Sequence, residues 1–362
     1  MTLPFLSSTA KKRDQIIAID LGDRTTKAVL MQRKGERYAL ARYVIRDSPP
    51  AEKDTAPAVL AEHLRAVVQA LDAKTKQVTL AIGSRDSILR NIELPYLPVN
   101  EMRQMLKFNT KSYLQQDLPD YTFDCYIVPP QKVNGPGGAP SATPGVEAGK
   151  SSPAGKYKVW VGGVKRQILA TYETALKSAG LVPDEITLSL LGPTNAFELS
   201  PPVKEAVALV DLGFKSSSIS IVSGSELCLS RIVEIGGHSI TNSLAESMGI
   251  SYAEAEGIKL GMPQEVEVHL LPALAPLGRD LRASIDFFEH HQDHPVGQVL
   301  ICGGASRSEF FIQNLQTELM IPCQPWNPVA TLELALPAKE AEELAQFSGL
   351  LAVATGSAAT LF

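Results

Sequence analysis

The sequence predicts an α/β protein in which two duplicated lobes of mixed sheet face each other across a cleft. The main observation is a pattern that occurs twice in the 362 residues, over Ile16–Lys27 and again over Val207–Ser218. In each copy an apolar run leads into Asp-Leu-Gly, and hydroxyl residues precede a second apolar run. This pattern is typical of a β-hairpin whose glycine lets the backbone approach a ligand closely. Two such hairpins in one chain indicate a duplicated domain with a cleft between the copies.

The hairpin turns carry residue types that hold phosphate groups. Turn amides and hydroxyls can bind phosphate oxygens, and an aspartate at the end of each first strand, Asp20 or Asp211, can hold Mg²⁺ through water. A turn-capping aspartate is the alternative at both positions, and a solvated strand lysine is the alternative for Lys27. The candidate contacts are Gly22, Asp23, Arg24, Thr25, Thr26 and Lys27 in the first turn, and Gly213, Lys215 and Ser216 in the second.

A strand that ends in Gly-Gly provides a third candidate surface. The segment Gln298–Arg307 is typical of a strand, a tight turn and the start of a helix, which continues over Glu309–Leu319. Two glycines in the turn would let a purine or a ribose lie flat against the backbone. The adenosine-binding candidates are therefore Gly303 and Gly304, with Ala305 and Arg307 beside them. For Arg307 a free surface position is the alternative.

Together these elements resemble the phosphate-1, phosphate-2 and adenosine motifs of the actin-like ATPase superfamily. Within it the chain resembles the PilM family of type IV pilus assembly and the related FtsA cell-division proteins. Two segments carry this narrower resemblance: Glu234–Thr241 contains a Gly-Gly turn, and Ile250–Lys259 fits a Tyr-x-x-Ala-Glu-x-x-Lys helix. The resemblance extends from Gln15 to Leu361. It implies an actin-like fold with an inserted α+β module of the FtsA and PilM type.

The resemblance implies a cofactor and roles for the phosphate-binding residues. Asp20 and Asp211 match aspartates that approach Mg²⁺ and the attacking water, so they are the candidate catalytic and metal-binding residues. Lys27 matches a lysine that reaches the β- and γ-phosphates. The implied cofactors are ATP or ADP together with Mg²⁺.

Four further residues match positions on the second lobe. Glu256 and Lys259, one helical turn apart, match residues that contact the ribose and the base. An exposed ion pair worth less than about 1 kcal/mol is the alternative for that pair. Gly236 and Gly237 match a turn that acts as a hinge or lies beside the phosphates.

Three residues depart from the family pattern. Relatives usually carry serine or threonine where this chain has Asp23, and small residues where it has Phe214 and Lys215. A carboxylate at position 23 would face phosphate charge unless Arg24 or Mg²⁺ neutralises it, or unless it turns away. Phe214 would crowd the phosphates, whereas Lys215 can bind them. We therefore expect nucleotide binding with weak or no hydrolysis, and whether the chain is an enzyme stays open.

The remaining pattern divides the chain into six segments. The inserted module is expected to contain a helix at Asn100–Gln116 capped by Asn100, strands at Tyr121–Val128 and Tyr157–Val164, a helix at Arg166–Ala179 and a strand at Glu185–Leu191. The expected segments are a first lobe (1–80), the inserted module (81–190) with a disordered Pro- and Gly-rich loop (129–155), a return to the first lobe and start of the second (191–230), a mainly helical subdomain (231–295), the rest of the second lobe (296–348) and a closing helix of the first lobe (349–362).

Composition argues against several other classes of protein. A formal charge of −5 and an isoelectric point near 5.8 disfavour a general nucleic-acid binder. The four cysteines are far apart, which predicts free thiols. No uncharged apolar run reaches the roughly 20 residues that span a bilayer, so direct membrane insertion is not expected. The apolar C-terminal segment has no basic face, which favours a packed helix over a membrane-touching tail.

The resemblance implies a cytoplasmic scaffold, peripheral to the inner membrane, in a type IV pilus or related type II secretion platform. Its expected partner is the N-terminal cytoplasmic tail of a PilN-like membrane protein, which would lie in a groove between the first lobe and the inserted module. Other platform proteins and self-association are further expected contacts. The alternatives are an FtsA-like division protein, or a pseudo-ATPase adaptor that binds no nucleotide. A sugar or acetate kinase is disfavoured because the inserted segment shows apolar packing.

Overall fold

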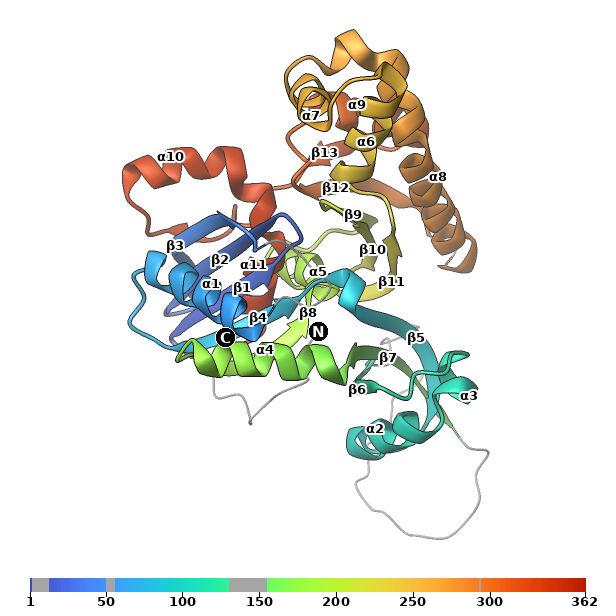
Figure 1. Ribbon diagram of the computed structural model, residues 1–362. Helices are drawn as coiled ribbons and strands as arrows, with labels where there is room; N and C mark the ends of the chain where they lie inside the picture. Colours follow the sequence, from blue (N-terminus) through green and yellow to red (C-terminus); the bar gives the residue numbers. More distant parts are fainter. Residues whose placement is uncertain (2–12, 50–55, 130–154, 293) are drawn as a thin grey trace.

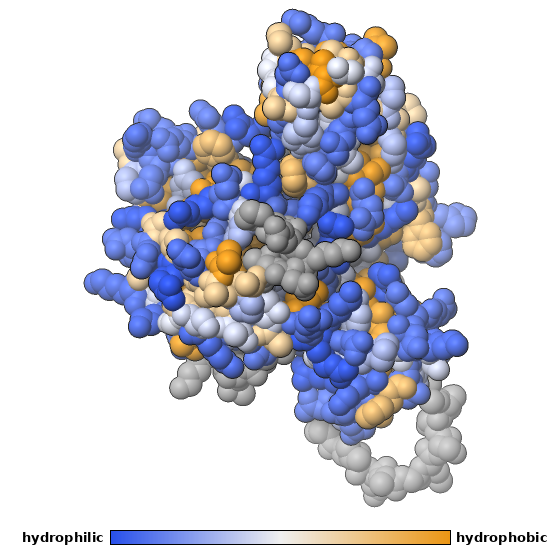
Figure 2. All heavy atoms as spheres, viewed as in Figure 1, coloured by the Kyte–Doolittle hydropathy of each residue, from blue (hydrophilic) through white to orange (hydrophobic). Residues whose placement is uncertain are grey.

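The chain forms two lobes and an inserted module in a computed structural model that describes residues 1, 13–49, 56–129, 155–292 and 294–362 (Figure 1). The loop expected at 129–155 lies outside these residues, apart from its two end positions. The face seen in Figure 2 is mostly hydrophilic, with apolar atoms in small groups. Among the described helices, none has the length and apolarity needed to cross a bilayer.

The first lobe is built on a six-stranded sheet in the order β14-β3-β2-β1-β4-β8. Its strands are β1 (Gln15–Leu21), β2 (Thr25–Lys34), β3 (Arg37–Asp47), β4 (Gln77–Ile82), β8 (Val182–Leu188) and β14 (Glu333–Leu334). Side chains of β1 alternate between the two faces. Ile17 and Ile19 pack with α1 (Pro57–Ala70) and α4 (Arg166–Ser178), whereas Ile16 and Ala18 pack with α10 (Ala338–Phe347) and α11 (Ala352–Ala359).

The second lobe is built on a five-stranded sheet in the order β11-β10-β9-β12-β13. Its strands are β9 (Ala206–Leu212), β10 (Ser217–Ser223), β11 (Glu226–Val233), β12 (Val296–Gly303) and β13 (Cys323–Pro325). The helices α8 (Glu267–Gln292) and α9 (Glu309–Leu319) bury apolar residues against the sheet. A smaller helical part contains α6 (Gly237–Met248), α7 (Tyr252–Gly261) and the 3₁₀ turn η3 (Pro263–Val266).

Four strands of each sheet share one topology, which confirms the predicted duplication. In both lobes an antiparallel three-stranded meander is followed by a strand parallel to its first member, so that β3-β2-β1-β4 corresponds to β11-β10-β9-β12. Asp20 is opposite Lys27 in the first hairpin, and Asp211 is opposite Ser218 in the second. Each predicted Asp-Leu-Gly segment therefore ends the first strand of a hairpin.

The inserted module has its own three-stranded sheet, in the order β5-β7-β6. It contains β5 (Ser87–Pro95), β6 (Tyr121–Ile127), β7 (Lys156–Lys165), α2 (Val99–Phe108) and α3 (Thr110–Leu114). The single helix expected over 100–116 is wrong, because the backbone leaves the helical region at Asn109 (φ −132°, ψ 37°). Asn100 is not the cap: Pro98 occupies that position, and the Asn100 side chain accepts a hydrogen bond from Arg103 within the helix.

Two neighbours of this module differ from the sequence expectation. The strand expected at Glu185–Leu191 begins earlier, as β8, and its last three residues form a 3₁₀ turn, η2 (Ser189–Leu191). β8 pairs with β4 in the first-lobe sheet, and α4 packs on α1. The segment that shares the inserted sheet is therefore Ser87–Lys165, shorter than 81–190.

The chain also returns to the first lobe earlier than expected. β14 pairs with β3, and Leu344 of α10 packs into the first-lobe core. The last residues form the 3₁₀ turn η4 (Ser348–Leu351) and then α11, which contacts β1, β2 and the short helix α5 (Gly192–Phe197). The C-terminal helix is thus a buried element of the first lobe.

Candidate functional site

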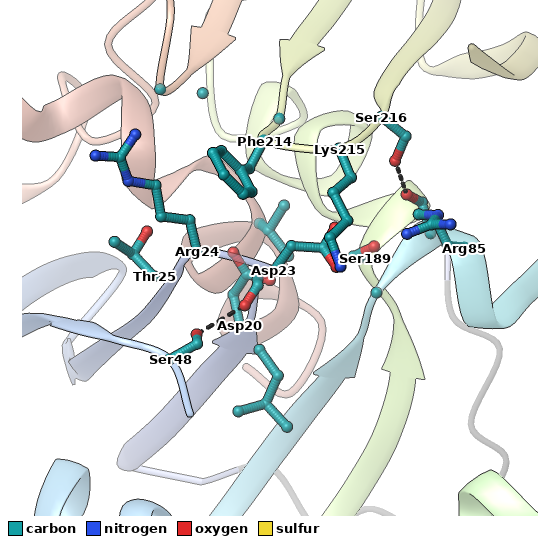
Figure 3. Close-up of a pocket in the computed structure, with 18 of the residues that line it drawn as sticks. Asp20, Asp23, Arg24, Thr25, Ser48, Arg85, Ser189, Phe214, Lys215 and Ser216 are labelled. Carbon is teal, nitrogen blue, oxygen red and sulfur yellow. Dashed lines mark hydrogen bonds and ion pairs between the residues drawn. The ribbon is translucent and has the colours of Figure 1, made fainter. Parts of the chain in front are cut away.

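The two hairpin turns and the Gly-Gly turn meet at one cavity of about 1400 Å³ between the lobes (Figure 3). The parallel pairing of β1 with β4 and of β9 with β12 brings the carboxyl ends of these strands to the same edges. Of the predicted site residues, the cavity is lined by Asp20, Gly22, Asp23, Arg24, Thr25, Lys27, Asp211, Gly213, Lys215, Ser216, Gly237, Glu256, Lys259, Gly303, Gly304, Ala305 and Arg307. Thr26 and Gly236 are not among its lining residues.

Asp20, Lys27 and Asp211 form the charged floor of the cavity. Lys27 Nζ donates to Asp20 Oδ2 at 2.8 Å, as their opposite positions in the hairpin allow. Burial raises the pKa of Asp211 to about 6; Lys27 lowers this pKa, whereas Asp20 raises it further. Burial lowers the pKa of Lys27, but Asp20 and then Asp211 more than offset this effect, so the net pKa is raised. Lys27 is therefore held as a cation between two carboxyl groups.

Gly303 is required by the close approach of two turns. Its φ is +85°, and a Cβ atom there would lie 2.4 Å from Asp211 Oδ1 and 2.6 Å from the Leu212 carbonyl oxygen. The next residue, Gly304, donates its N–H to the same Leu212 oxygen at 3.0 Å. The turn at Gly303 and Gly304 is thus packed directly against the end of β9, the first strand of the second hairpin.

Thr26 is the clearest correction to the predicted site. Neighbouring residues of a strand point to opposite faces, so Thr25 and Lys27 line the cavity while Thr26 lies beneath it with no exposed surface. Its hydroxyl contacts His63 Nε2 at 2.7 Å and Ser48 Oγ at 2.9 Å. Thr26 therefore supports the turn and does not offer its hydroxyl to a ligand in the cavity.

Gly236 also supports a turn instead of lining the cavity. A Cβ atom on it would lie 2.4 Å from the Phe214 carbonyl oxygen. Gly237 and His238 donate their backbone N–H groups to Gly213 and Phe214 at 3.0 and 2.8 Å. The start of α6 is therefore fastened to the second hairpin turn.

The departing residue Asp23 is neutralised from the opposite lobe. The sequence offered Arg24 as its partner, but the carboxylate lies 3.6 Å from Lys215 Nζ of the second hairpin turn. Arg24 instead points away and pairs with Glu256 at 2.8 Å, with its guanidinium 5.4 Å from the centre of the Phe214 ring. Figure 3 shows Phe214 and Lys215 standing opposite Arg24 and Asp23. Of the three residues that depart from the family pattern, Asp23 and Lys215 thus pair across the cleft, and Phe214 contacts Arg24, the neighbour of Asp23.

Glu256 and Lys259 form a partly buried network on α7 in which Lys259 is buried, so the alternative of an exposed ion pair is wrong. Lys259 Nζ donates to Glu256 Oε2 and to Thr241 Oγ1, each at 2.6 Å. Burial raises the pKa of Glu256, but hydrogen bonds from Lys259, Thr241 and Arg24 more than reverse this and bring it to about 2. Burial lowers the pKa of Lys259, and Glu256 opposes that shift. Glu256 is therefore a fixed carboxylate at the cavity wall.

Arg307 also crosses the cleft. It lines the cavity from the second lobe, and its guanidinium lies 5.2 Å from the centre of the Phe347 ring at the end of α10. Arg24 and Arg307 thus cross in opposite directions, each over a phenylalanine of the other lobe.

Sequence reasoning missed a second group of lining residues after β4. Ser84 and Arg85, in the 3₁₀ turn η1 (Ser84–Asp86), contact the second lobe through Ser216 at 3.2 Å and Glu234 at 3.8 Å. A signal was present: β4 is an apolar run that follows a helix, and its parallel pairing with β1 places the residues after it at the same edge. Ser48, which contacts the first turn from the end of β3, had no such signal.

Comparison with known proteins agrees with this geometry. Residues 197–362 match the family model described as type IV pilus assembly protein PilM. A solved chain of a PilM–PilN type IV pilus biogenesis complex has a TM-score of 0.78 at 22% identity, covering 97% of this chain and 99% of that chain. The ethanolamine utilization protein EutJ from Carboxydothermus hydrogenoformans has a TM-score of 0.55 at 14% identity, covering 98% and 93%. The predicted actin-like fold is confirmed, because the chain shares the fold of the solved PilM–PilN chain over nearly its whole length, and residues 197–362 resemble the PilM family model.

Proposed function

We propose that this chain is a nucleotide-binding scaffold of a type IV pilus, or related type II secretion, platform. Its cleft binds ATP or ADP with Mg²⁺ and hydrolyses ATP weakly or not at all. It binds the N-terminal cytoplasmic tail of a PilN-like membrane protein, which holds it in the cytoplasm at the inner membrane. Contacts with other platform proteins and self-association belong to the same proposal.

One observation carries the nucleotide proposal: two Asp-Leu-Gly turns and a Gly-Gly turn converge on a single cavity. The turns bring together the residue types that phosphates need, since Thr25 and Lys27 of the first hairpin and Lys215 and Ser216 of the second line the same cavity, where turn amides can also bind phosphate oxygens. Phosphates would lie between the first and second hairpin turns, with Lys27 and Lys215 as their cations. The ribose and base would lie between Glu256 and the turn at Gly303.

The donor set fits a magnesium ion. Asp20 and Asp211 supply carboxylate oxygens, the ligand type that Mg²⁺ prefers, and a hydrated ion can be held through water. Bound Mg²⁺ would supply charge neutralisation for the phosphates. Lys27 fixes the Asp20 carboxylate beforehand, because their 2.8 Å hydrogen bond orients both groups.

We propose weak hydrolysis because of the residues present at the two hairpin turns. In-line attack needs a water aligned with the γ-phosphate. Here Phe214 and the Asp23–Lys215 pair occupy the place where relatives carry small residues. The same contacts favour the second candidate function, an adaptor that binds no nucleotide.

The partner proposal rests on the likeness to a chain solved in a PilM–PilN complex. The candidate groove lies between the first lobe and the inserted module. Exposed aromatic side chains on the module are candidate contacts: Phe108 at the end of α2 is 75% exposed, and Tyr96 after β5 is 58% exposed. Titration with a synthetic tail peptide of a PilN-like protein, against a scrambled peptide, tests this part of the proposal. Equal binding of the two peptides would refute it.

Calorimetric titration with Mg-ATP and Mg-ADP, with phosphate release followed in the same samples, tests the nucleotide proposal. We expect micromolar binding with negligible turnover. Asp20→Asn and Asp211→Asn should abolish the Mg²⁺-dependent part of binding, whereas Asp47→Asn, exposed at the end of β3, should not change it. Steady turnover would instead identify an ATPase. No binding by the wild-type protein would leave the adaptor function.

A further inference from the structure

A chain of three hydrogen bonds runs from α1 to the first hairpin turn. His63 Nε2 lies 2.7 Å from Thr26 Oγ1, and Thr26 Oγ1 lies 2.9 Å from Ser48 Oγ. Ser48 Oγ then donates to the carbonyl oxygen of Gly22 at 2.7 Å, a bond drawn in Figure 3. Of the three side chains only Thr26 belongs to a sequence motif, yet together they connect a helix, a strand and a loop end to the turn.

The direction of every proton in this chain follows from the number of donors. A carbonyl oxygen only accepts, so the single hydroxyl proton of Ser48 is used on Gly22. Ser48 must therefore accept from Thr26, whose own proton is used in turn. Thr26 can then only accept from His63, so the imidazole carries its proton on Nε2. Burial, and then Arg46, lower the pKa of His63, which favours the neutral ring.

Ser48 holds the turn at two places. Besides the Gly22 contact, its backbone N–H donates to the Arg24 carbonyl oxygen at 2.9 Å. Because a trans peptide unit is planar, a carbonyl held on one side directs the N–H of the next residue to the other side. The N–H groups of Asp23 and Thr25 are therefore directed away from Ser48, and both residues line the cavity.

We propose that His63, Thr26 and Ser48 are positioning residues that orient the first phosphate turn of the cleft. His63 and Thr26 lie beneath the turn and do not line the cavity, whereas Ser48 lines it; all three act on the turn through Gly22 and Arg24. This inference rests on the proposed nucleotide function for its purpose. Its physical content, a turn held in one orientation by a directional chain of donors, is independent of any ligand.

Amide hydrogen exchange of the turn residues 22–25 tests the chain in the full-length protein. His63→Leu, Thr26→Val and Ser48→Ala should each speed exchange roughly three- to tenfold, the factor expected for one lost hydrogen bond. His63→Gln should restore slow exchange, since glutamine places an N–H donor at nearly the reach of Nε2. Thr26→Ser should do so as well, because it keeps the hydroxyl. If His63→Leu and Thr26→Val acted only by changing side-chain volume, His63→Gln and Thr26→Ser would not restore slow exchange.

Thr79→Val is the matched control for Thr26→Val. Both threonines are fully buried in the first-lobe sheet, but Thr79 Oγ1 has no hydrogen-bond partner among the described residues. Thr79→Val should leave exchange of the turn unchanged. Unchanged exchange in His63→Leu, Thr26→Val and Ser48→Ala would overturn the inference, as would equal exchange in His63→Leu and His63→Gln.

Mg-ATP titration of the same variants separates this inference from the proposed function. If the wild-type protein binds, His63→Leu should raise Kd roughly three- to tenfold and His63→Gln should restore it. If the wild-type protein does not bind, the nucleotide proposal fails, while faster exchange with rescue would still support the positioning chain. Binding unaffected by all three disruptive variants would overturn the positioning role.

Discussion

Arg24 reaches across the cleft and donates from Nη1 to Oε1 of Glu256 at 2.8 Å, joining residues 232 positions apart in the sequence. The guanidinium also lies over the ring of Phe214, so one side chain contacts two elements of the opposite lobe. Glu256 is held for this contact, because its other oxygen accepts from Thr241 and Lys259. The same carboxylate is the proposed ribose contact. The Glu256 carboxylate therefore takes part both in the contact between the lobes and in the proposed nucleotide site.

The Arg24–Glu256 pair should couple the lobes. Arg24 is about half exposed, so we expect a coupling free energy of no more than about 1 kcal/mol. A double-mutant cycle with Arg24→Gln and Glu256→Gln, measured by denaturant unfolding, gives this coupling. Small-angle scattering should show a larger radius of gyration for Arg24→Gln, because the contact joins the two lobes.

The pair Arg231–Asp280 is the matched control for this cycle. It has the same 2.8 Å distance but lies within the second lobe. The variants that make up this control cycle should have the same radius of gyration as the wild-type protein. A zero coupling for Arg24 and Glu256 together with an unchanged radius would contradict the interlobe role.

Local patterns explain why much of the fold was predictable. The hairpins at Asp20 and Asp211 are formed by residues close in sequence, and the helix at Glu309–Leu319 was predicted with its observed bounds. The partner of β8 was not predictable in this way. Its pairing with β4 joins strands about 100 residues apart, and an apolar strand carries no mark of its neighbour.

The candidate site shows the same division. Short sequence motifs predict the turns and their glycines, but no such motif predicts which charged residues pair across the cleft. Asp23 has Arg24 beside it in the sequence, yet Lys215 from the other lobe is its partner. Thr26 was assigned to the cavity because its residue type fits phosphate. The strand register places it underneath instead.

Gly303 and Gly304 should respond very differently to the same substitution. Gly303→Ala places a side chain at φ +85° and against Asp211 Oδ1, so we expect a loss of roughly 2–4 kcal/mol in the free energy of unfolding. Gly304→Ala is its control, since the nearest atom would be 4.0 Å away; its effect should stay within about 0.5 kcal/mol. Urea unfolding of both variants measures the difference, and equal losses would refute the assigned packing.

Glu185 should make stability depend on pH. Its side chain is buried in β8, Oε1 has no partner among the described residues, and burial raises its pKa from 4.5 to about 7. The folded state therefore holds the proton more tightly than the unfolded state. The stability from this group is complete below about pH 4.5 and is lost as the pH rises through 7. Above pH 7 the cost of the buried charge reaches up to about 3 kcal/mol.

Glu185→Gln tests this dependence, because an amide does not ionise. Relative to wild type, the variant should gain free energy of unfolding between pH 4 and pH 8, as measured by urea unfolding at several pH values. The exposed Glu342→Gln is a suitable control and should follow wild type across the range. A constant difference between Glu185→Gln and wild type at all pH values would show that the carboxyl does not titrate in this window.

Trp160 connects the inserted module with the second lobe. It is buried in β7, and its indole N–H donates to the Leu227 carbonyl oxygen of β11 at 3.1 Å. Lys158, two residues earlier on the same strand, pairs with Glu226 at 3.2 Å. β5 of the same sheet begins directly after η1, whose Ser84 contacts the second hairpin turn. The inserted module, proposed as one wall of the partner groove, is therefore packed against the second lobe, which lines one side of the proposed nucleotide cleft.

Trp160→Phe should weaken the coupling between the two proposed ligands without abolishing either binding event. The ring is kept, but the N–H is lost, which costs about 1–2 kcal/mol because a buried carbonyl is left unpaired. Calorimetric titration of the tail peptide with and without Mg-ADP gives the coupling, which must be the same when the order of addition is reversed. Trp326→Phe, at a ring packed edge-on against Phe197, controls for loss of indole area. If the coupling free energy in Trp160→Phe equals that of the wild-type protein, the Trp160–Leu227 hydrogen bond does not couple the two ligands.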